Sequence, residues 1–129
     1  MQKPRTVLVV VVDDDSMMRE VLKLILHSED YLVLGEAANG ESAIAQCTKL
    51  KPDLVLLDIN MPKMDGLQAL EDIRKTNLVC RIMMVSADAT MDRVAEAIQK
   101  GASGFVVKPF NAASVLDRID KCFKKGTSQ

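Results

Sequence analysis

The sequence is poor in cysteine and in aromatic residues. Its 129 residues include no Trp, one Tyr, three Phe and three cysteines, and no two cysteines form a CxxC pair. An odd number of widely spaced thiols argues against a disulfide framework and is typical of a reducing compartment. We therefore expect a cytoplasmic protein in which Cys47, Cys80 and Cys122 pack as small hydrophobic side chains.

Long hydrophobic runs and an excess of one charge are also absent. The longest apolar run near the N-terminus is Val7–Val12, and no small-residue cleavage site follows it. A membrane-spanning helix needs roughly 20 apolar residues. The 17 basic and 18 acidic residues leave a formal net charge of -1, which gives no general attraction to nucleic acid or to anionic membranes. We expect partners to recognise a local surface, without membrane insertion or direct contact with nucleic acid.

Linkers and low-complexity segments are missing as well. The composition, 48% hydrophobic and 27% charged, is typical of a globular domain that buries a core. We therefore expect a single domain over residues 1–129, with the folded core at about residues 6–124 and short frayed ends.

The sequence does contain five apolar runs that alternate with helical patterns. Most of the runs are continuous, which is typical of strands buried on both faces of a parallel sheet. The expected strands are Val7–Val12, 32–35, Leu54–Leu57, 82–85 and Gly104–Val107. The helical positions expected to face the core are Met18, Val21, Leu22 and Ile25; Ala43, Cys47 and Leu50; Leu67, Leu70 and Ile73; Met91, Val94, Ala95 and Ile98; and Val115, Leu116, Ile119 and Phe123. This pattern predicts an α/β fold, one five-stranded parallel sheet with five helices on both faces.

Polar side chains stand just past the C-terminal ends of four of these strands. They are Asp13, Asp14 and Asp15 after the first strand, Asp58 after the third, Ser86 after the fourth and Lys108 after the fifth. Open α/β sheets bind ligands at that edge. Crowded carboxylates raise one another's pKa unless a cation neutralises them, and oxygen ligands favour Mg²⁺, or Mn²⁺, over zinc. A carboxylate beside Mg²⁺ can also attack phosphorus, while the lysine and serine hold phosphoryl oxygens. Asp58 is therefore the expected phosphoacceptor.

Each of these residues also has a simpler interpretation. The acidic run could cap the first helix, Ser86 could cap another, and Lys108 could be a solvated lysine. His27, the single histidine, is interpreted as an ordinary cationic helix end. The simpler interpretations require several independent coincidences at one sheet edge, so a phosphoryl site is favoured.

Two other functions compete with this one. Asp13-x-Asp15 resembles the start of Mg²⁺-dependent phosphohydrolases of the haloacid-dehalogenase type, but this leaves Asp58 unexplained and the chain is too short to add a cap over the site. A flavodoxin-like module that binds flavin or nucleotide would need a phosphate loop after the first strand. Acidic residues stand there instead, and the chain has only four aromatic residues for ring stacking.

Four motifs lie at the strand ends in a fixed order. They are VVDD with SMMR one residue later, LVLLDINMPKMDG, MMVSAD and GASGFVVKPF. Together they resemble the receiver domain of response regulators, closely the single-domain chemotaxis type, over residue 6 to about residue 124. The resemblance implies the flavodoxin-like receiver fold with strand order 2-1-3-4-5.

The resemblance also implies a role for each site residue. Asp58 is the phosphoacceptor and a metal ligand, Asp14 binds Mg²⁺ directly, Asp13 binds it mostly through water, and the backbone carbonyl of Asn60 completes the protein ligands. Ser86 moves to bond the phosphoryl group, Lys108 pairs with it, and the Lys108–Pro109 peptide bond is cis. Phe105 matches the aromatic switch position, and Asn60 and Asp88 tune the access of water.

Three positions depart from the family pattern. Asp15 adds a third acid, so the metal-binding pair depends on the alignment, although residues 16–19 favour Asp13 and Asp14. Phe105 has no phenolic hydroxyl to hydrogen-bond. Ser86 lacks the methyl group of Thr and is less constrained at χ1.

The resemblance further implies a switch rather than an enzyme, with only self-directed phosphotransfer and autodephosphorylation. The phosphoryl group comes from the phosphohistidine of a sensor histidine kinase or phosphotransfer protein. The new charge turns Phe105 inward and remodels the face of the fourth helix, fifth strand and fifth helix. A downstream protein binds this face, which includes Arg93, Glu96, Lys100 and Phe105. We expect a monomer, with a dimer through the same face as the alternative. A receiver excised from a longer DNA-binding regulator fits the same sequence.

Overall fold

The computed structural model describes residues 6–125, which form five strands and five helices in strict alternation. Their order is β1 (Val7–Val12), α1 (Ser16–His27), β2 (Tyr31–Ala37), α2 (Gly40–Leu50), β3 (Leu54–Leu57), α3 (Gly66–Thr76), β4 (Arg81–Ser86), α4 (Met91–Gln99), β5 (Gly104–Val107) and α5 (Ala112–Lys125). No helix in this range is long and apolar enough to cross a membrane.

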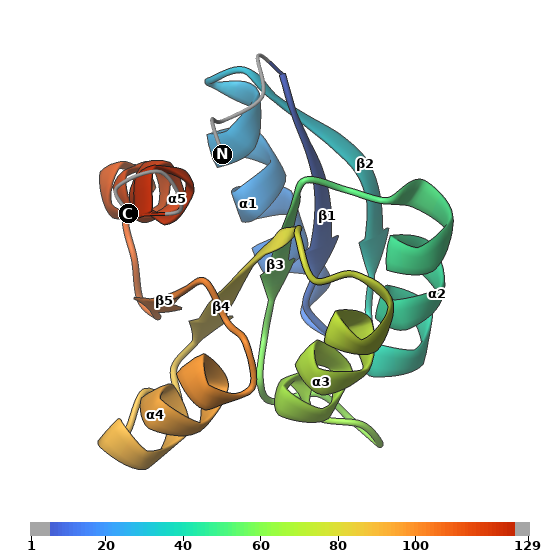
Figure 1. Cartoon of the computed structure of the whole chain (residues 1–129). Coiled ribbons are helices and arrows are strands. Elements are labelled where there is room, and N and C mark those ends of the chain that lie inside the picture. Colours follow the sequence, from blue (N-terminus) through green and yellow to red (C-terminus); the bar gives the residue numbers. More distant parts are fainter. Residues whose placement is uncertain (1–5, 126–129) are drawn as a thin grey trace.

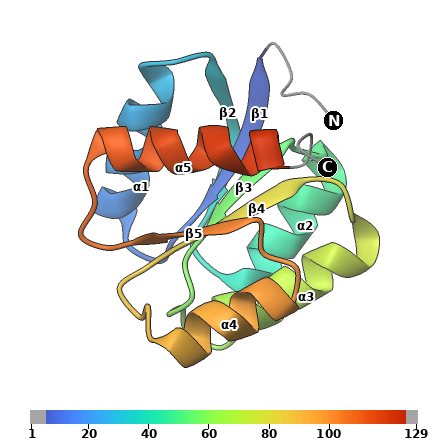
Figure 2. The same cartoon turned by 60° about the vertical axis from the view of Figure 1, so that its left-hand side comes forward.

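The strands form one parallel sheet in the order β2-β1-β3-β4-β5 (Figure 1). Helices α1 and α5 cover one face, and α2, α3 and α4 cover the other, as Figure 2 shows. The α/β class, the strand order and the placement of helices on both faces are therefore confirmed.

Two hydrophobic cores lie on the two faces of the sheet. Along β3, Leu54 and Leu56 point to the core beneath α1 and α5, whereas Val55 and Leu57 point to the core beneath α2, α3 and α4. All four side chains are fully buried. A strand buried on both faces cannot alternate apolar with polar residues, which explains the continuous apolar run.

The three cysteines are buried and none of them forms a disulfide, as predicted. Burial, together with the neighbouring Cys80 thiol, raises the pKa of Cys47 to about 12. Burial also raises the pKa of Cys80, although Arg74 opposes this shift. Protonated thiols of this kind are unreactive, so these side chains serve packing.

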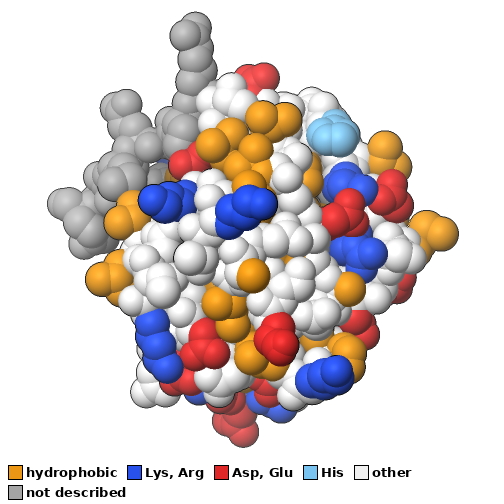
Figure 3. Space-filling model, turned by 90° about the vertical axis from the view of Figure 1, so that its right-hand side faces the viewer, with side chains coloured by type: hydrophobic (Ala, Val, Ile, Leu, Met, Phe, Trp, Pro, Cys, Tyr) orange, Lys and Arg blue, Asp and Glu red, His pale blue; other side chains and the backbone are white. Residues whose placement is uncertain are grey.

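The edge strand β2 is longer than the sequence predicted, at Tyr31–Ala37 in place of 32–35. Its register against β1 shifts between Val9 and Val10, so that Val33 faces Val9 and Gly35 faces Val10. Only Tyr31 and Ala37 are buried in this strand. Figure 3 shows the face that carries α2 and β2, where charges of both signs lie interspersed and no field of one sign forms.

The predicted core face of α4 is wrong. Met91 and Ile98 are 88% and 48% exposed and Ala95 is exposed, whereas Ala97 is fully buried. The helix therefore lies on the sheet through Ala97 and the half-buried Val94, and its larger apolar side chains point to solvent. In α1 the same prediction is correct for Leu22 but not for Val21, which is 37% exposed. The other predicted core positions, in α2, α3 and α5, are buried or half-buried.

Candidate functional site

The pairing of β1 with β3 places two carboxylates side by side. Val12 is the register partner of Leu57, so Asp13 and Asp58 both follow directly at the carboxyl edge of the sheet. The backbone N–H of Asp58 donates to the carbonyl of Val12 at 3.0 Å, and that of Asp13 donates to the carbonyl of Ala37 at 3.0 Å. These main-chain hydrogen bonds therefore fix the backbone positions from which the side chains of Asp13 and Asp58 extend.

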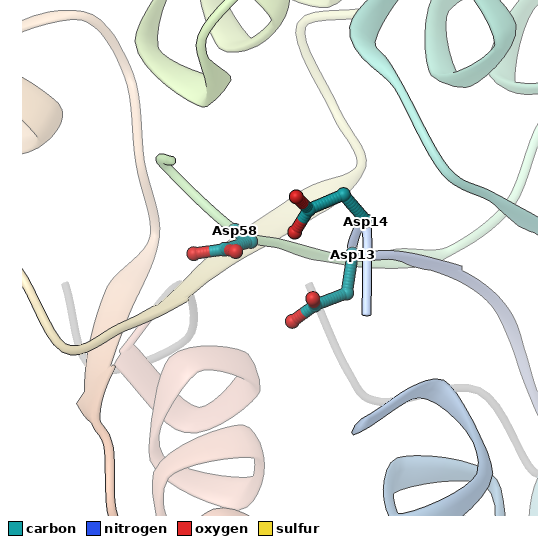
Figure 4. Close-up of side chains that lie close together, drawn as sticks. All are labelled: Asp13, Asp14 and Asp58. Carbon is teal, nitrogen blue, oxygen red and sulfur yellow. The ribbon is translucent and has the colours of Figure 1, made fainter. Parts of the chain in front are cut away.

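Asp13, Asp14 and Asp58 converge at this edge (Figure 4). Each offers a carboxylate oxygen, and the three oxygens lie within 4.8 Å of one another. Asp13 and Asp58 are 1% and 5% exposed, and Asp14 is exposed. Three convergent carboxylates, one of them open to water, fit a hard divalent cation that keeps part of its hydration shell. The residues thus fit Mg²⁺.

Asp15 has a separate task. Its side chain caps α1 by accepting from the backbone N–H groups of Met17 at 2.9 Å and Met18 at 3.4 Å. The capping interpretation of the acidic run is therefore correct for Asp15 alone. Because Asp15 is not part of the carboxylate cluster, the structure gives the Asp13-x-Asp15 phosphohydrolase no support.

Lys108 lies against the same carboxylates. Its Nζ is 2.8 Å from Oδ2 of Asp13 and 3.5 Å from Oδ2 of Asp58. Burial lowers the pKa of Lys108, but the hydrogen bond to Asp13 and the charge of Asp58 outweigh burial and leave the pKa raised. Lys108 is therefore charged at neutral pH and stands where a phosphoryl group on Asp58 would need a cation.

The Asp58 carboxyl group resists ionisation. Burial raises its pKa and the Asp13 charge raises it further, whereas Lys108 and the backbone N–H groups of Asn60 and Ile59 lower it. The net shift is upward, as expected for a buried carboxylate near another with a single cation between them. A divalent cation at this point would relieve that cost.

Comparison with known proteins decides what this arrangement belongs to. The family model of the response regulator receiver domain matches residues 9–120. The chain belongs to the response regulator receiver family. Receivers of this family act in two-component signalling, and the chain is of the chemotaxis CheY-like type.

The receiver is similar to proteins of that type over nearly its whole length. It is 43% identical to the chemotaxis protein CheY of Listeria monocytogenes, over 88% of this chain and 96% of that protein. It is 40% identical to the nitrate/nitrite response regulator NarL of Escherichia coli, over 92% of this chain but 54% of NarL. The CheX-CheY-BeF3-Mg²⁺ complex of Borrelia burgdorferi contains a chain that aligns with a TM-score of 0.89 at 36% identity, over 91% of this chain and 89% of that one.

Ser86 lies at the C-terminal end of β4 and is fully buried. Its Oγ accepts a hydrogen bond from the backbone N–H of Asp88 at 3.1 Å, and its carbonyl accepts from the N–H of Lys108 at 3.0 Å. The hydroxyl hydrogen of Ser86 is therefore left to donate elsewhere. The next peptide bond after Lys108, to Pro109, is cis, as expected for the receiver.

Phe105 differs from the expectation that it lies on the partner-binding face. It is 7% exposed and packs in the core beneath α2, α3 and α4. Because its side chain carries no hydroxyl, inward burial costs no hydrogen bond to water. The receiver thus already holds the ring inward in this structure.

Two arginines make contacts that sequence reasoning did not predict, Arg19 with Asp13 and Arg93 with Asp88. Arg19 donates from its guanidinium to the carbonyl of Asp13 at 2.7 Å and from Nε to Glu36 at 2.7 Å, which ties the acidic loop to α1 and β2. Arg93 lies 3.2 Å from the carboxylate of Asp88. Arg19 belongs to the SMMR motif, but only the fold shows what it contacts.

The separate roles of the acids predict different responses to charge removal. We expect Asp14→Asn to weaken Mg²⁺ binding by roughly tenfold or more, because it removes a ligand charge. Asp15→Asn should change the affinity by less than about twofold, because Asn caps a helix as well as Asp does. Isothermal titration with Mg²⁺ measures both, and equal weakening by the two variants would show that the metal uses Asp15.

Proposed function

We propose that Asp58 accepts a phosphoryl group from the phosphohistidine of a sensor histidine kinase or a phosphotransfer protein. The observation that carries this proposal is the convergence of Asp13, Asp14 and Asp58 at the carboxyl edge of the sheet, with Lys108 against Asp13 and Asp58. This site combines a nucleophilic carboxylate, a ligand set for Mg²⁺ and a fixed cation. Phosphoryl transfer needs little more than such positioning and charge neutralisation.

The transfer itself exchanges one bond for another. A carboxylate oxygen of Asp58 attacks phosphorus, the P–N bond of the donor breaks, and the imidazole nitrogen keeps the bonding electron pair. Lys108 leaves its contact with Asp58 to pair with the new phosphoryl oxygens, and the Ser86 hydroxyl donates to another of them. Asp14, Asp58 and the backbone carbonyl of Asn60 would hold Mg²⁺ directly and Asp13 would hold it through water, and the ion would supply neutralising charge. Mn²⁺ is an alternative because it takes the same oxygen ligands.

Hydrolysis of the aspartyl phosphate returns Asp58 to its unphosphorylated state. Water attacks phosphorus, the Asp58 carboxylate leaves, and inorganic phosphate is released. Asn60 is exposed and Asp88 is half-buried, both within two residues of a site residue, so we propose that they tune the approach of this water. The protein acts only on itself and is a switch rather than an enzyme with an external substrate.

The output of the switch is proposed to lie on the α4–β5–α5 face. Of the charged residues predicted there, Lys100 pairs with Glu71 of α3 at 3.4 Å and with Glu96 of α4 at 3.7 Å. The apolar side chains of Met91 and Ile98 on α4 and Val107 on β5 are instead 88%, 48% and 51% exposed. We propose that a downstream protein covers these three residues with apolar side chains of its own, and that the receiver is otherwise a cytoplasmic monomer.

Intact mass spectrometry tests the proposed function. The protein is incubated with Mg²⁺ and a small acyl phosphate, with a parallel sample that contains a chelator. We expect a gain of one phosphoryl group with Mg²⁺ and none with the chelator. If the first sample shows no gain and beryllofluoride does not bind either, the site is a plain metal site and the proposal is wrong.

A further inference from the structure

Asp88 connects the phosphorylation site to helix α4, because its backbone contacts Ser86 and its side-chain carboxylate contacts Arg93. Its backbone N–H donates to Oγ of Ser86 at 3.1 Å, which holds its main chain at the end of β4. Its carboxylate Oδ2 lies 3.2 Å from Nε of Arg93, in the first turn of α4. The carboxylate of an acid two residues beyond Ser86 is thus held by a cation on a neighbouring helix.

The position of Arg93 is itself fixed. Its backbone N–H donates to Oγ1 of Thr90, the N-cap of α4, at 3.3 Å. Its guanidinium also lies 3.5 Å from Glu96 one turn further along the helix. The contact with Glu96 and the main-chain hydrogen bond to Thr90 therefore fix the place to which Asp88 is drawn.

The negative charge of the site makes the contact between Arg93 and Asp88 important for an approaching phosphodonor. Within residues 6–125, the ion pairs of the Asp13, Asp14 and Asp58 carboxylates are those of Asp13 and Asp58 with Lys108, so the three carboxylates outnumber the cation that pairs with them and the metal-free edge carries an excess of negative charge. The donors that approach it carry phosphoryl groups and are anionic as well. A fourth carboxylate without a partner, two residues from Ser86, would add to the repulsion that such a donor meets.

We infer that Arg93 is a positioning residue for phosphorylation. It neutralises the Asp88 carboxylate and holds it against α4, which keeps the path to Asp58 open to an anionic phosphodonor. This inference rests on the proposed function of Asp58 and adds a regulator of its reaction rate. Arg93 touches neither the phosphoryl group nor the metal ligands, and it acts through Asp88.

The pair adds little to the stability of the fold. The side chains of Arg93 and Asp88 are 38% and 29% exposed, and ion pairs this open to water contribute at most about 1 kcal/mol. The effect of Arg93 should therefore appear in a rate and not in the melting temperature. This difference separates a positioning role from a structural one.

The test measures the rate of phosphorylation of the whole protein by a small dianionic acyl phosphate with saturating Mg²⁺ at low ionic strength. We expect Arg93→Met to slow the reaction by roughly three- to tenfold, because removing one cation near a charged path lowers the approach rate by this order. Arg93→Lys keeps the charge and should retain most of the rate. The slowing should shrink at high salt, where exposed charges are screened.

Two further variants identify the cause. In an Asp88→Asn background, Arg93→Met should cause no further slowing, because no carboxylate is left to neutralise. Lys100→Met removes the same charge from the C-cap of α4. Because Lys100 pairs with Glu71 and Glu96, the rate of this variant should stay near that of the wild type.

The results have distinct meanings. Slowing by Arg93→Met that persists without the Asp88 carboxylate, or equal slowing by Lys100→Met, would overturn the inference in favour of a general field effect. An unchanged rate in Arg93→Met would overturn it outright. Failure of the proposed function looks different, because the wild-type protein itself would then gain no phosphoryl group.

Discussion

Gly66→Ala is expected to destabilise the protein and to remove most phosphorylation at once. An added Cβ at residue 66 would lie 1.9 Å from the carbonyl oxygen of Asp58 and 2.8 Å from Cα of Ile59. Both atoms belong to the backbone, so no side chain can move to make room. We expect a loss of about 3 kcal/mol in the free energy of unfolding, the upper end for overpacking, measured by urea denaturation.

The functional effect follows from which backbone must move. The N–H of Gly66 donates to the carbonyl of Ile59 at 2.7 Å, so the start of α3 lies directly on the chain that carries Asp58, the proposed phosphoacceptor. A shifted Asp58 leaves its place beside Lys108 and the other carboxylates. Phosphoryl uptake, measured by intact mass under conditions where the variant is folded, should fall by roughly tenfold or more.

Gly35→Ala is the matched control. A Cβ at residue 35 would also meet an atom at close range, Oε1 of Gln46 at 2.3 Å. That atom is the end of a flexible side chain and can rotate away, so the loss should stay below about 1 kcal/mol. If both glycine variants lose the same stability, the close approach of Gly66 to Asp58 is not the cause.

Asp58→Asn is expected to change function and stability in opposite directions. Phosphoryl incorporation should be lost completely, because an amide oxygen is a poor nucleophile and the aspartyl phosphate can no longer form. The metal-free variant should nevertheless be more stable than the wild type at neutral pH, by about 1 kcal/mol or roughly 3–5 °C in melting temperature. Asp53→Asn, at the opposite end of β3, should keep phosphoryl incorporation intact.

The pH dependence follows from the direction of the Asp58 pKa. Burial and the Asp13 charge raise the pKa of Asp58 in the folded protein above the ordinary value of 3.8. The contribution of the Asp58 carboxyl group to the free energy of unfolding is therefore fully present below pH 3.8 and is lost as the pH rises through the raised pKa of the folded protein. The difference in the free energy of unfolding between Asp58→Asn and the wild type should be small near pH 3.8 and should increase toward neutral pH.

Thermal melts at acidic and neutral pH, with chelator or with Mg²⁺, measure this difference in stability between Asp58→Asn and the wild type. Mg²⁺ should stabilise the wild type at neutral pH and narrow its difference from the variant, because ligand binding to the folded state adds stability. A variant less stable than the wild type at neutral pH in chelator would contradict the prediction. Such a result would mean that Lys108 and the backbone N–H groups more than offset the burial of Asp58.

Helix α4 illustrates why sequence periodicity was insufficient for burial. Met91, Val94, Ala95 and Ile98 form a regular apolar stripe, and such a stripe normally faces a core. The structure buries Ala97 instead and exposes Met91 and Ile98. A pattern records which residues share a side of a helix, but the packing of the helix on the sheet decides which side is covered.

The acidic run shows the same limit at the site. Sequence alone placed three adjacent aspartates after β1 and left both capping and metal binding open. The backbone turn separates them, because Asp15 caps α1 while Asp13 and Asp14 converge on Asp58. Asp13 accepts from the N–H of Asp15 at 2.9 Å, which helps to set this turn.

The sequence by itself determined the α/β class, the number of strands and the edge of the sheet where the polar residues gather. These properties depend on local patterns, since continuous apolar runs make buried parallel strands and the residue after each run must lie at the carboxyl edge. The motifs also determined the family by resemblance. The tertiary structure decided how Asp13, Asp58 and Lys108 meet, that Arg19 holds the acidic loop, and that Arg93 holds Asp88. Those contacts join residues far apart in the chain or on separate elements, and only the pairing and packing of whole elements brings them together.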